Sequence, residues 1–285
     1  MGGRRGVLAG RRDLQVGLIL SLLGLLLTLG AGVLRPGDPS ALGPTGQSLQ
    51  SPSMDHPLGT DTLGRDVWQR VLHGGRVSLL IGWSTTLAAT VLGTLVGLAA
   101  GLTWRPLRLL LTYIIDLFMA FPSVYLVLLL VAVSRPSLWL LVLVLTVSTW
   151  MDVARLVRAE SMALRDREFV AAARGLGLNA WQVALRHVAP NLLPTVLVAA
   201  ALRVGHTILM ESFLSFLGLG PQEPLVSWGA MVAQGRSHLL DAWWLTLFPG
   251  LAITVTVLAY NLLADGLRAH FWPEGRGEGG RHDTP

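Results

Sequence analysis

Two residue types are missing from this sequence of 285 residues: it has no cysteine and no lysine. Without cysteine the chain can form no disulfide, no thiolate metal cluster and no cysteine nucleophile. Without lysine it cannot form the nucleotide-binding loop G-x-x-x-x-G-K-S/T, whose lysine reaches the β- and γ-phosphates. The chain is therefore not an ATPase of this kind. No set of nucleophile, base and orienting group can be assigned either, so no enzymatic activity is expected.

Charged residues are also scarce. They make up 14% of the sequence, against 52% hydrophobic residues, and the mean hydropathy is +0.56. A soluble domain with a hydrated surface is normally more polar. Apolar runs of about 20 residues are each long enough to cross roughly 30 Å of hydrocarbon as a helix. The pattern predicts an all-α integral membrane protein with about six transmembrane helices, at residues 14–34, 77–102, 107–133, 138–150 with a helical continuation, 192–217 and 242–267.

The distribution of arginine predicts the orientation of these helices. All 22 basic residues are arginine. Fifteen of them lie before the first run, between the second and third, between the fourth and fifth, and after the sixth, whereas the opposite side holds six that are accompanied by acidic residues, namely Arg35, Arg65, Arg70, Arg76, Arg135 and Arg236. With six crossings these segments share one side, which the positive-inside rule makes cytoplasmic, so both termini are expected there. Arginines spread over helix ends do not favour nucleic acid as a partner. The first apolar run is too long for an ordinary signal peptide, so we expect it to remain as a helix.

Residues 168–190, "EFVAAARGLGLNAWQVALRHVAP", interrupt the apolar runs. Gly177 is a natural left-handed end for a first short helix. Asn179 can cap a second helix, with Gln182 completing a capping box, and Pro190 can begin the next membrane-crossing helix. The apolar residues of the second helix recur at i, i+3, i+4 and i+7, namely Trp181, Ala184, Leu185 and Val188. On spacing alone, an amphipathic pair packed on the membrane or on its own neighbours is the alternative.

Part of this segment, "AAARGLG" followed by "HVAP", resembles the EAA loop of ABC importer permeases, whose coupling helix docks on an ATPase subunit. Further stretches resemble, in order, the second permease subunit of dipeptide, oligopeptide and nickel importers. They include "HPLGTDTLGRDVWQRVLHGGRVSLLIG", "IIDLFMAFPSVYLVLLLVAV", "ESFLSFLGLGPQEPLVSWGAMVAQGR" and "FPGLAITVTVLAYNLLADGLR", and the resemblance covers residues 55–268. One position departs from it: the acid that opens the family motif is Ala171 here, with Glu168 one helical turn earlier.

The resemblance implies a type I ABC importer permease fold with a cytoplasmic coupling helix, in a bacterial or archaeal cell membrane. Residues 1–75 would form the cytoplasmic N-terminal tail, the first helix and an external loop. Residues 76–268 would form a five-helix permease core that includes the coupling segment 168–190, and residues 269–285 a cytoplasmic tail. The implied function is import of dipeptides or oligopeptides by alternating access. Nickel and other small solutes remain open as substrates.

The same resemblance implies the partners. They are two cytoplasmic ATPase domains that use ATP and Mg²⁺, a second homologous permease subunit, an external substrate-binding protein and membrane lipid, whereas this chain itself binds no cofactor. Within the coupling segment, small residues permit close docking, large apolar residues fill a groove on the ATPase, and arginines meet its acidic groups. The expected contact residues are Ala172, Ala173, Arg174, Leu176, Gly177, Trp181, Leu185 and Arg186.

Four ionisable residues fall inside apolar runs, where charge is costly and faces protein or water rather than lipid. They are Asp116, Arg203, His206 and Glu211, and both a pathway-facing and a helix-packing role remain open for them. The external stretch "MDHPLGTDTLGRD" is expected to be a folded loop that helps to receive the binding protein, its carboxylates capping backbone donors. The stretch "LSFLGLGPQEPLVSWGAM" is typical of a re-entrant or interfacial gate element.

Two other classes of protein compete with this interpretation. A stand-alone secondary transporter would need intramembrane acidic relays or repeated broken helices, and neither stands out in the sequence. A membrane-embedded hydrolase would need a catalytic set, and none can be assigned. The seven histidines show no spacing typical of metal ligands, so we expect no metal site.

Overall fold

The computed structural model describes residues 2–272 apart from 45, 123–124, 126 and 130–136. These residues form helices and connecting loops without a β-strand, as the apolar pattern predicted. In chain order the elements are α1 (Gly2–Leu29), α2 (Ala31–Leu34), α3 (Val67–Leu102), α4 (Arg105–Ala120), α6 (Leu138–Val147), α7 (Trp150–Arg165), α8 (Glu168–Gly175), α9 (Ala180–Val183), the π-helical turn η1 (Ala184–Val188), α10 (Ala189–Phe216), α11 (Trp228–Gly235), the 3-10 turn η2 (Arg236–His238) and α12 (Trp244–Phe271).

Five helical segments in the described part of the chain are long and apolar enough to cross a membrane. They correspond to the first, second, fourth, fifth and sixth predicted runs. The third run is represented by α4, and its continuation towards residue 133 lies partly outside the described residues. The boundary also differs at α3, which begins at Val67 rather than residue 77, because the Asp66 carboxylate accepts the Gln69 N–H at 3.0 Å and caps the helix there.

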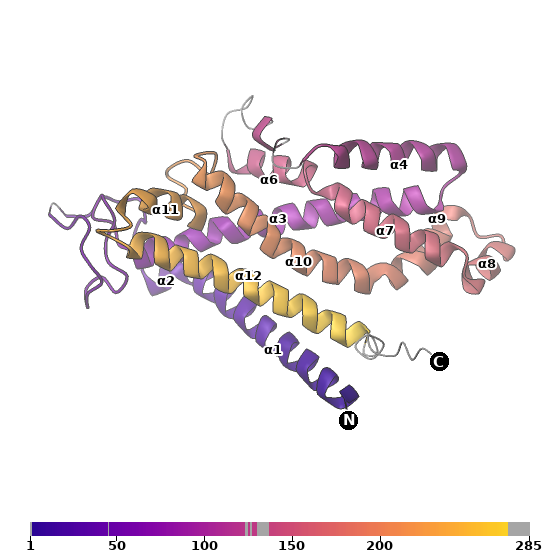
Figure 1. The fold of residues 1–285 in the computed structure, drawn as a ribbon, viewed down its shortest axis with the longest axis horizontal. Helices are drawn as coiled ribbons and strands as arrows, with labels where there is room; N and C mark the ends of the chain where they lie inside the picture. Colours follow the sequence, from indigo (N-terminus) through magenta and orange to yellow (C-terminus); the bar gives the residue numbers. More distant parts are fainter. Residues whose placement is uncertain (1, 45, 123–124, 126, 130–136, 273–285) are drawn as a thin grey trace, which may run out of the picture.

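The bundle is elongated, and its two ends carry different structures (Figure 1). One end is formed by α8 and α9, and the start of α1 and the end of α12 lie toward it. The opposite end is formed by α11 and the long loop between α2 and α3. The helices α1 and α12 run side by side along one flank. The coupling segment and the predicted external loop therefore lie at opposite ends of the bundle.

Helix α3 packs on α7 with backbone contact along a row of glycines. Gly93, Gly97 and Gly101 recur once per turn on one face of α3. A Cβ atom added at these positions would lie 2.6 Å from the Trp150 carbonyl oxygen, the Ala154 carbonyl oxygen and the Ser161 Cβ respectively. Small residues at this spacing let transmembrane helices approach closely. The row fixes the distance between these two helices.

Replacing Gly97 with leucine is expected to destabilise the fold by about 1–3 kcal/mol, because the side chain must displace the α7 backbone. Gly24 provides a matched control, since an added Cβ meets nothing within 4 Å there. The midpoint of thermal unfolding in detergent should fall for Gly97→Leu and stay near the natural value for Gly24→Leu. Equal midpoints for the two variants would contradict the backbone contact.

Helix α6 ends in the middle of its membrane span, and α7 begins after a two-residue turn. Just before and within this turn, the hydroxyls of Thr146, Ser148 and Thr149 each donate to the carbonyl four residues earlier, at 2.7 Å. Hydroxyl bonds of this type loosen and bend helices. The turn leaves the Thr149 carbonyl available to a partner outside its own helix.

Candidate functional site

The coupling segment has the local structure that its sequence predicts. Gly177 has φ +86°, in the left-handed region that glycine favours, and ends the turn after α8. Asn179 accepts the Gln182 N–H at 2.9 Å, while the Gln182 side chain accepts the Asn179 N–H at 3.0 Å. The predicted bend and capping box are therefore confirmed.

The second helix of the segment differs from the prediction in two respects. It is not a separate helix, because α9 runs through η1 directly into α10, and residues 180–216 form one continuous helical unit. The prediction that its four apolar residues share one face was wrong as well. Ala184 and Val188 are buried, whereas Trp181 and Leu185 are 60% and 45% exposed. A π-helical turn holds more residues than an α-helical one, so the 3.6-residue period does not carry across it.

The expected ATPase-contact residues lie mostly on the surface of this end of the molecule. Leu176 is 84% exposed, and the exposed set also includes Ala172, Arg174, Gly177, Trp181, Leu185 and Arg186. Ala173 is an exception and corrects the prediction. It is 4% exposed and packs with Val170 and Val183 in the core beneath the segment, because α8 needs an inward face to hold it on α9 and η1. Ala173 therefore supports the surface rather than forming it.

Two exposed arginines accompany these apolar side chains. Arg174 and Arg186 are exposed, and neither lies within 4 Å of a carboxylate in the described residues. A cavity of about 410 Å³ opens beside Arg174, and Trp104 and Arg165 also line it. Exposed large apolar residues among cations are typical of a surface that meets an acidic protein partner.

At the opposite end, the loop before α3 is held by buried ion pairs. The Asp61 carboxylate accepts the Arg65 Nε–H at 2.6 Å and lies 3.5 Å from the Arg70 Nε, and Arg65 also reaches Glu223 at 2.9 Å. Burial opposes the charge of Arg65, but its bonds to Glu223 and Asp61 outweigh this effect and raise its pKa above the ordinary value. Asp61 also accepts the backbone N–H groups of Leu63 and Arg65, as expected for a capping carboxylate.

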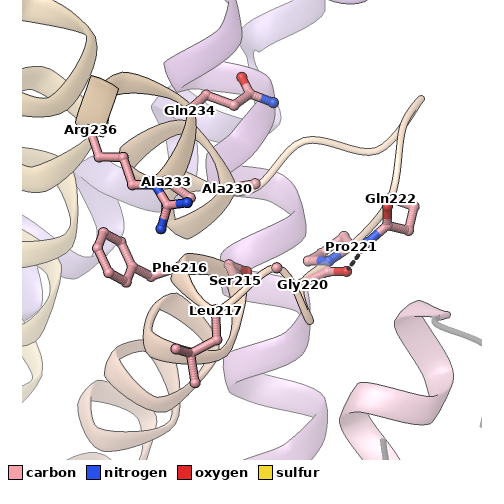
Figure 2. A pocket seen from close by; sticks show the side chains of 11 residues that line it. Ser215, Phe216, Leu217, Gly220, Pro221, Gln222, Ala230, Ala233, Gln234 and Arg236 are labelled. Carbon is pink, nitrogen blue, oxygen red and sulfur yellow. Dashed lines mark hydrogen bonds between the residues drawn. The ribbon is translucent and has the colours of Figure 1, made fainter. Parts of the chain in front are cut away.

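The predicted gate stretch links α10 to α11 at the same end. The end of α10, the loop after it and α11 enclose a cavity of about 430 Å³. Figure 2 shows Arg236 and Phe216 at one side of this cavity, with the guanidinium carbon 5.4 Å from the ring centre, and Gln222 bonded to the Gly220 carbonyl at the other. The N–H of Trp228 donates to the Ser78 hydroxyl at 3.1 Å, which fastens the start of α11 to α3.

Glu211 lies within the bundle and has no exposed surface. Its carboxylate accepts the Ser215 hydroxyl at 2.7 Å, and the Ser78 hydroxyl lies 3.4 Å from its other oxygen. The same Ser78 binds the α11 backbone. Of the two roles left open for Glu211, these contacts favour packing between α3, α10 and α11.

Arg203 and His206 lie one turn apart in the middle of α10, and their surroundings differ. Arg203 donates to the Thr149 carbonyl at 2.8 Å and lies 3.4 Å from the Asp152 carboxylate, whereas His206 is exposed. Asp116 is exposed on α4, with no cationic group within 4 Å in the described residues. The described part of the chain brings together no three His, Cys, Asp or Glu side chains able to hold a metal ion.

Comparison with known proteins identifies the family. Residues 93–274 match the family model described as the binding-protein-dependent transport system inner membrane component. The chain belongs to this family. It is 40% identical over 269 residues to a Brucella suis protein named as a peptide transport system permease, with 94% of this chain and 90% of the relative covered. It is 37% identical to the dipeptide transport system permease DppC of Alkalihalophilus pseudofirmus, over 89% of this chain and 83% of the relative.

A solved structure supports the same fold for this permease family member. An inward-facing form of the MetNI methionine ABC transporter aligns with a TM-score of 0.58, at 18% identity, covering 70% of this chain and 95% of that one. The type I permease fold expected from the resemblance is therefore confirmed.

One polar residue of this family member was overlooked by sequence reasoning. Asp152 lies inside the helical continuation of the fourth apolar run, and the structure places its carboxylate beside Arg203. The same signal that marked Asp116, an ionisable group within a membrane-crossing segment, applies to Asp152 and identifies it.

Proposed function

We propose that the chain is the membrane-spanning permease subunit of an ATP-driven, binding-protein-dependent importer of dipeptides or oligopeptides. The names of its relatives support the substrate class, and its family supports the dependence on a binding protein. One structural observation carries the mechanism. A single helical unit, residues 180–216, joins the exposed coupling segment to the loop that lines the cavity of about 430 Å³ beside α11, here called the outer cavity. At 1.5 Å per residue, it spans roughly 55 Å.

Because this helical unit is continuous, a movement of the coupling segment can be transmitted to the far end of the bundle. Two cytoplasmic ATPase domains, which use ATP and Mg²⁺, would dock on the exposed apolar side chains and arginines of the segment. Their closure on ATP would move the segment, and the helical unit would carry the motion to the outer cavity. An inward-facing pathway would thereby switch to an outward-facing one, as alternating access requires.

The remaining partners belong to the other side and to the flank of the bundle. An external binding protein would deliver the peptide to the end formed by α11 and the loop before α3. A second, homologous permease subunit would complete the pathway. In this arrangement both termini lie in the cytoplasm, and the protein resides in a bacterial or archaeal cell membrane.

Purification of the chain from native membranes in mild detergent tests this proposal. A second permease and ATPase subunits should be recovered in stoichiometric amounts. Once reconstituted with the binding protein, this complex should take up a labelled dipeptide only with ATP. If the chain is recovered alone and still transports, a secondary transporter replaces the proposal.

Replacing Gly177 with valine is expected to lower peptide uptake at least tenfold. A β-branched residue in the left-handed region costs about 1–3 kcal/mol, and about 1.4 kcal/mol corresponds to a factor of ten in the population of the docking conformation. An added Cβ at Gly177 meets nothing within 4 Å, so the bundle itself should remain folded. Asparagine tolerates this conformation, so Gly177→Asn is the matched control. Equal uptake by the two variants, at equal expression, would remove the conformational role.

A further inference from the structure

The exposed face of α7 differs from those of the other spanning helices. Its exposed residues recur on one face and are Asp152, Arg155, Ala159 and Ala163, without a large apolar side chain. By contrast, α1, α3, α10 and α12 each expose several leucine or valine side chains. Large apolar side chains suit contact with lipid, whereas charged groups in a membrane face protein or water. The exposed face of α7 is therefore not a lipid-contacting face.

The charged part of this face lies near the middle of two membrane-crossing segments. Asp152 is near the middle of the 28-residue span Leu138–Arg165, and Arg203 is near the middle of α10, which also has 28 residues. In secondary transporters, solute sites lie near the middle of the spanning helices, commonly where a helix is broken. The break between α6 and α7 occurs directly before Asp152.

Arg203 is held in this region by contacts with protein, and it provides a positive charge beside Asp152. Its side chain is 10% exposed, and its guanidinium donates to the Thr149 carbonyl at 2.8 Å, beside the break. Its Nε–H is buried without a partner in the described residues. The contact from Arg203 to Asp152 is long, at 3.4 Å, and it occupies one side of a carboxylate that is 57% exposed. A carboxylate can accept about four hydrogen bonds, so Asp152 retains most of this capacity.

We propose that Asp152 lines the translocation pathway and contacts the cationic amino group of the transported peptide. Within the pair, the negative charge is the accessible one and the positive charge is enclosed by protein, while Arg155 is a separate exposed cation one turn along the same face. An ammonium group, with three donors, satisfies the open side of the carboxylate. The choice of ligand rests on the proposed peptide importer, since a free amino terminus is the cation that unmodified peptides share. Arg203 acts as a positioning residue that holds the carboxylate.

Thiol labelling tests whether this face is in contact with water. The chain contains no cysteine, so a single introduced thiol is its only labelling site. Asp152→Cys is compared with Leu258→Cys, because Leu258 is 51% exposed near the middle of α12. In the assembled transporter in membranes, a charged, water-soluble thiol reagent should modify position 152 at least tenfold faster, since only a hydrated thiol forms the reactive thiolate. Equally slow reaction at both positions would place this face against lipid or a partner chain and overturn the inference.

Peptide uptake by charge variants tests the contact itself. In the reconstituted complex, Asp152→Asn should lower uptake at least tenfold, because a hydrogen bond to a charged group is lost, and Asp152→Glu should retain most of it. The double variant Asp152→Asn, Arg203→Gln separates contact from structure. If Asp152 only balances Arg203, removal of both charges restores uptake, and the contact is refuted. Continued slow uptake by the double variant supports it.

The labelling experiment needs no peptide, so it separates this inference from the proposed function. If the natural complex fails to import peptides, the proposed substrate and the ligand assigned to Asp152 are both wrong. The difference in labelling between positions 152 and 258 would then still identify the exposed face of α7 as a hydrated surface.

Discussion

Replacing both Leu176 and Trp181 with alanine is expected to release the ATPase subunits from the purified complex. These side chains are 84% and 60% exposed at the tip of the coupling segment, an unusual position for such large apolar groups unless a partner covers them. Truncating a side chain that acts as an interface hot spot costs about 2 kcal/mol or more, so if Leu176 and Trp181 both act in this way, the double variant loses on the order of 4 kcal/mol. That loss corresponds to roughly a thousandfold in affinity.

Co-purification of ATPase subunits with the double variant, followed by peptide-stimulated ATP hydrolysis, measures this effect. Trp139 supplies a matched control because it is a 68% exposed tryptophan on α6, away from the coupling segment. Trp139→Ala should retain the ATPase subunits. If the double variant retains them as well, the coupling surface lies elsewhere on this chain.

Replacing Asp61 with alanine is expected to destabilise the external end by about 3–5 kcal/mol, the usual cost of removing one partner from a buried ion pair. Arg65 and Arg70 both lose this carboxylate, and their side chains are 5% and 3% exposed, so water does not readily replace it. The loop before α3 would lose its anchor. Stimulation of ATP hydrolysis by the binding protein should therefore fall along with the unfolding temperature.

Two further substitutions separate the contributions of Asp61. Asparagine keeps an oxygen that can accept the Leu63 and Arg65 N–H groups, so Asp61→Asn should have an intermediate unfolding temperature. Asp55 lies in the same loop but is exposed, and Asp55→Ala should leave the temperature close to that of the natural protein. An effect of Asp55→Ala as large as that of Asp61→Ala would refute the role of the buried pairs.

Several features of the fold depend on residues that are close in the chain, and these were predicted well. The apolar runs specify membrane-crossing helices because a helix in lipid must satisfy its own backbone and expose apolar side chains. The bend at Gly177 and the capping box of Asn179 and Gln182 involve contacts between residues no more than five apart. Such contacts follow from local conformational preference.

Features that depend on distant residues were not predicted. The partner of Arg203 is 51 residues away in sequence, and the serine that reaches Glu211 from α3 is 133 residues away. The inward position of Ala173 depends on the packing of α8 against α9 and η1. No local pattern distinguishes these side chains from others of the same type, because their role is set by the helix that packs against them.

By itself, the sequence determined the class of protein, its membrane-crossing helices, the bend and capping box of the coupling segment and, through resemblance, the family. Only the tertiary structure decided that residues 180–216 form one helical unit and that Leu176, Trp181 and Leu185 face outward around a core containing Ala173. It also decided which ionisable groups in the membrane are enclosed, as Glu211 is, and which remain open, as Asp152 does. The physical reason is that periodicity records how apolar a helix face is, whereas the crossing of helices decides whether that face is covered by protein or left exposed.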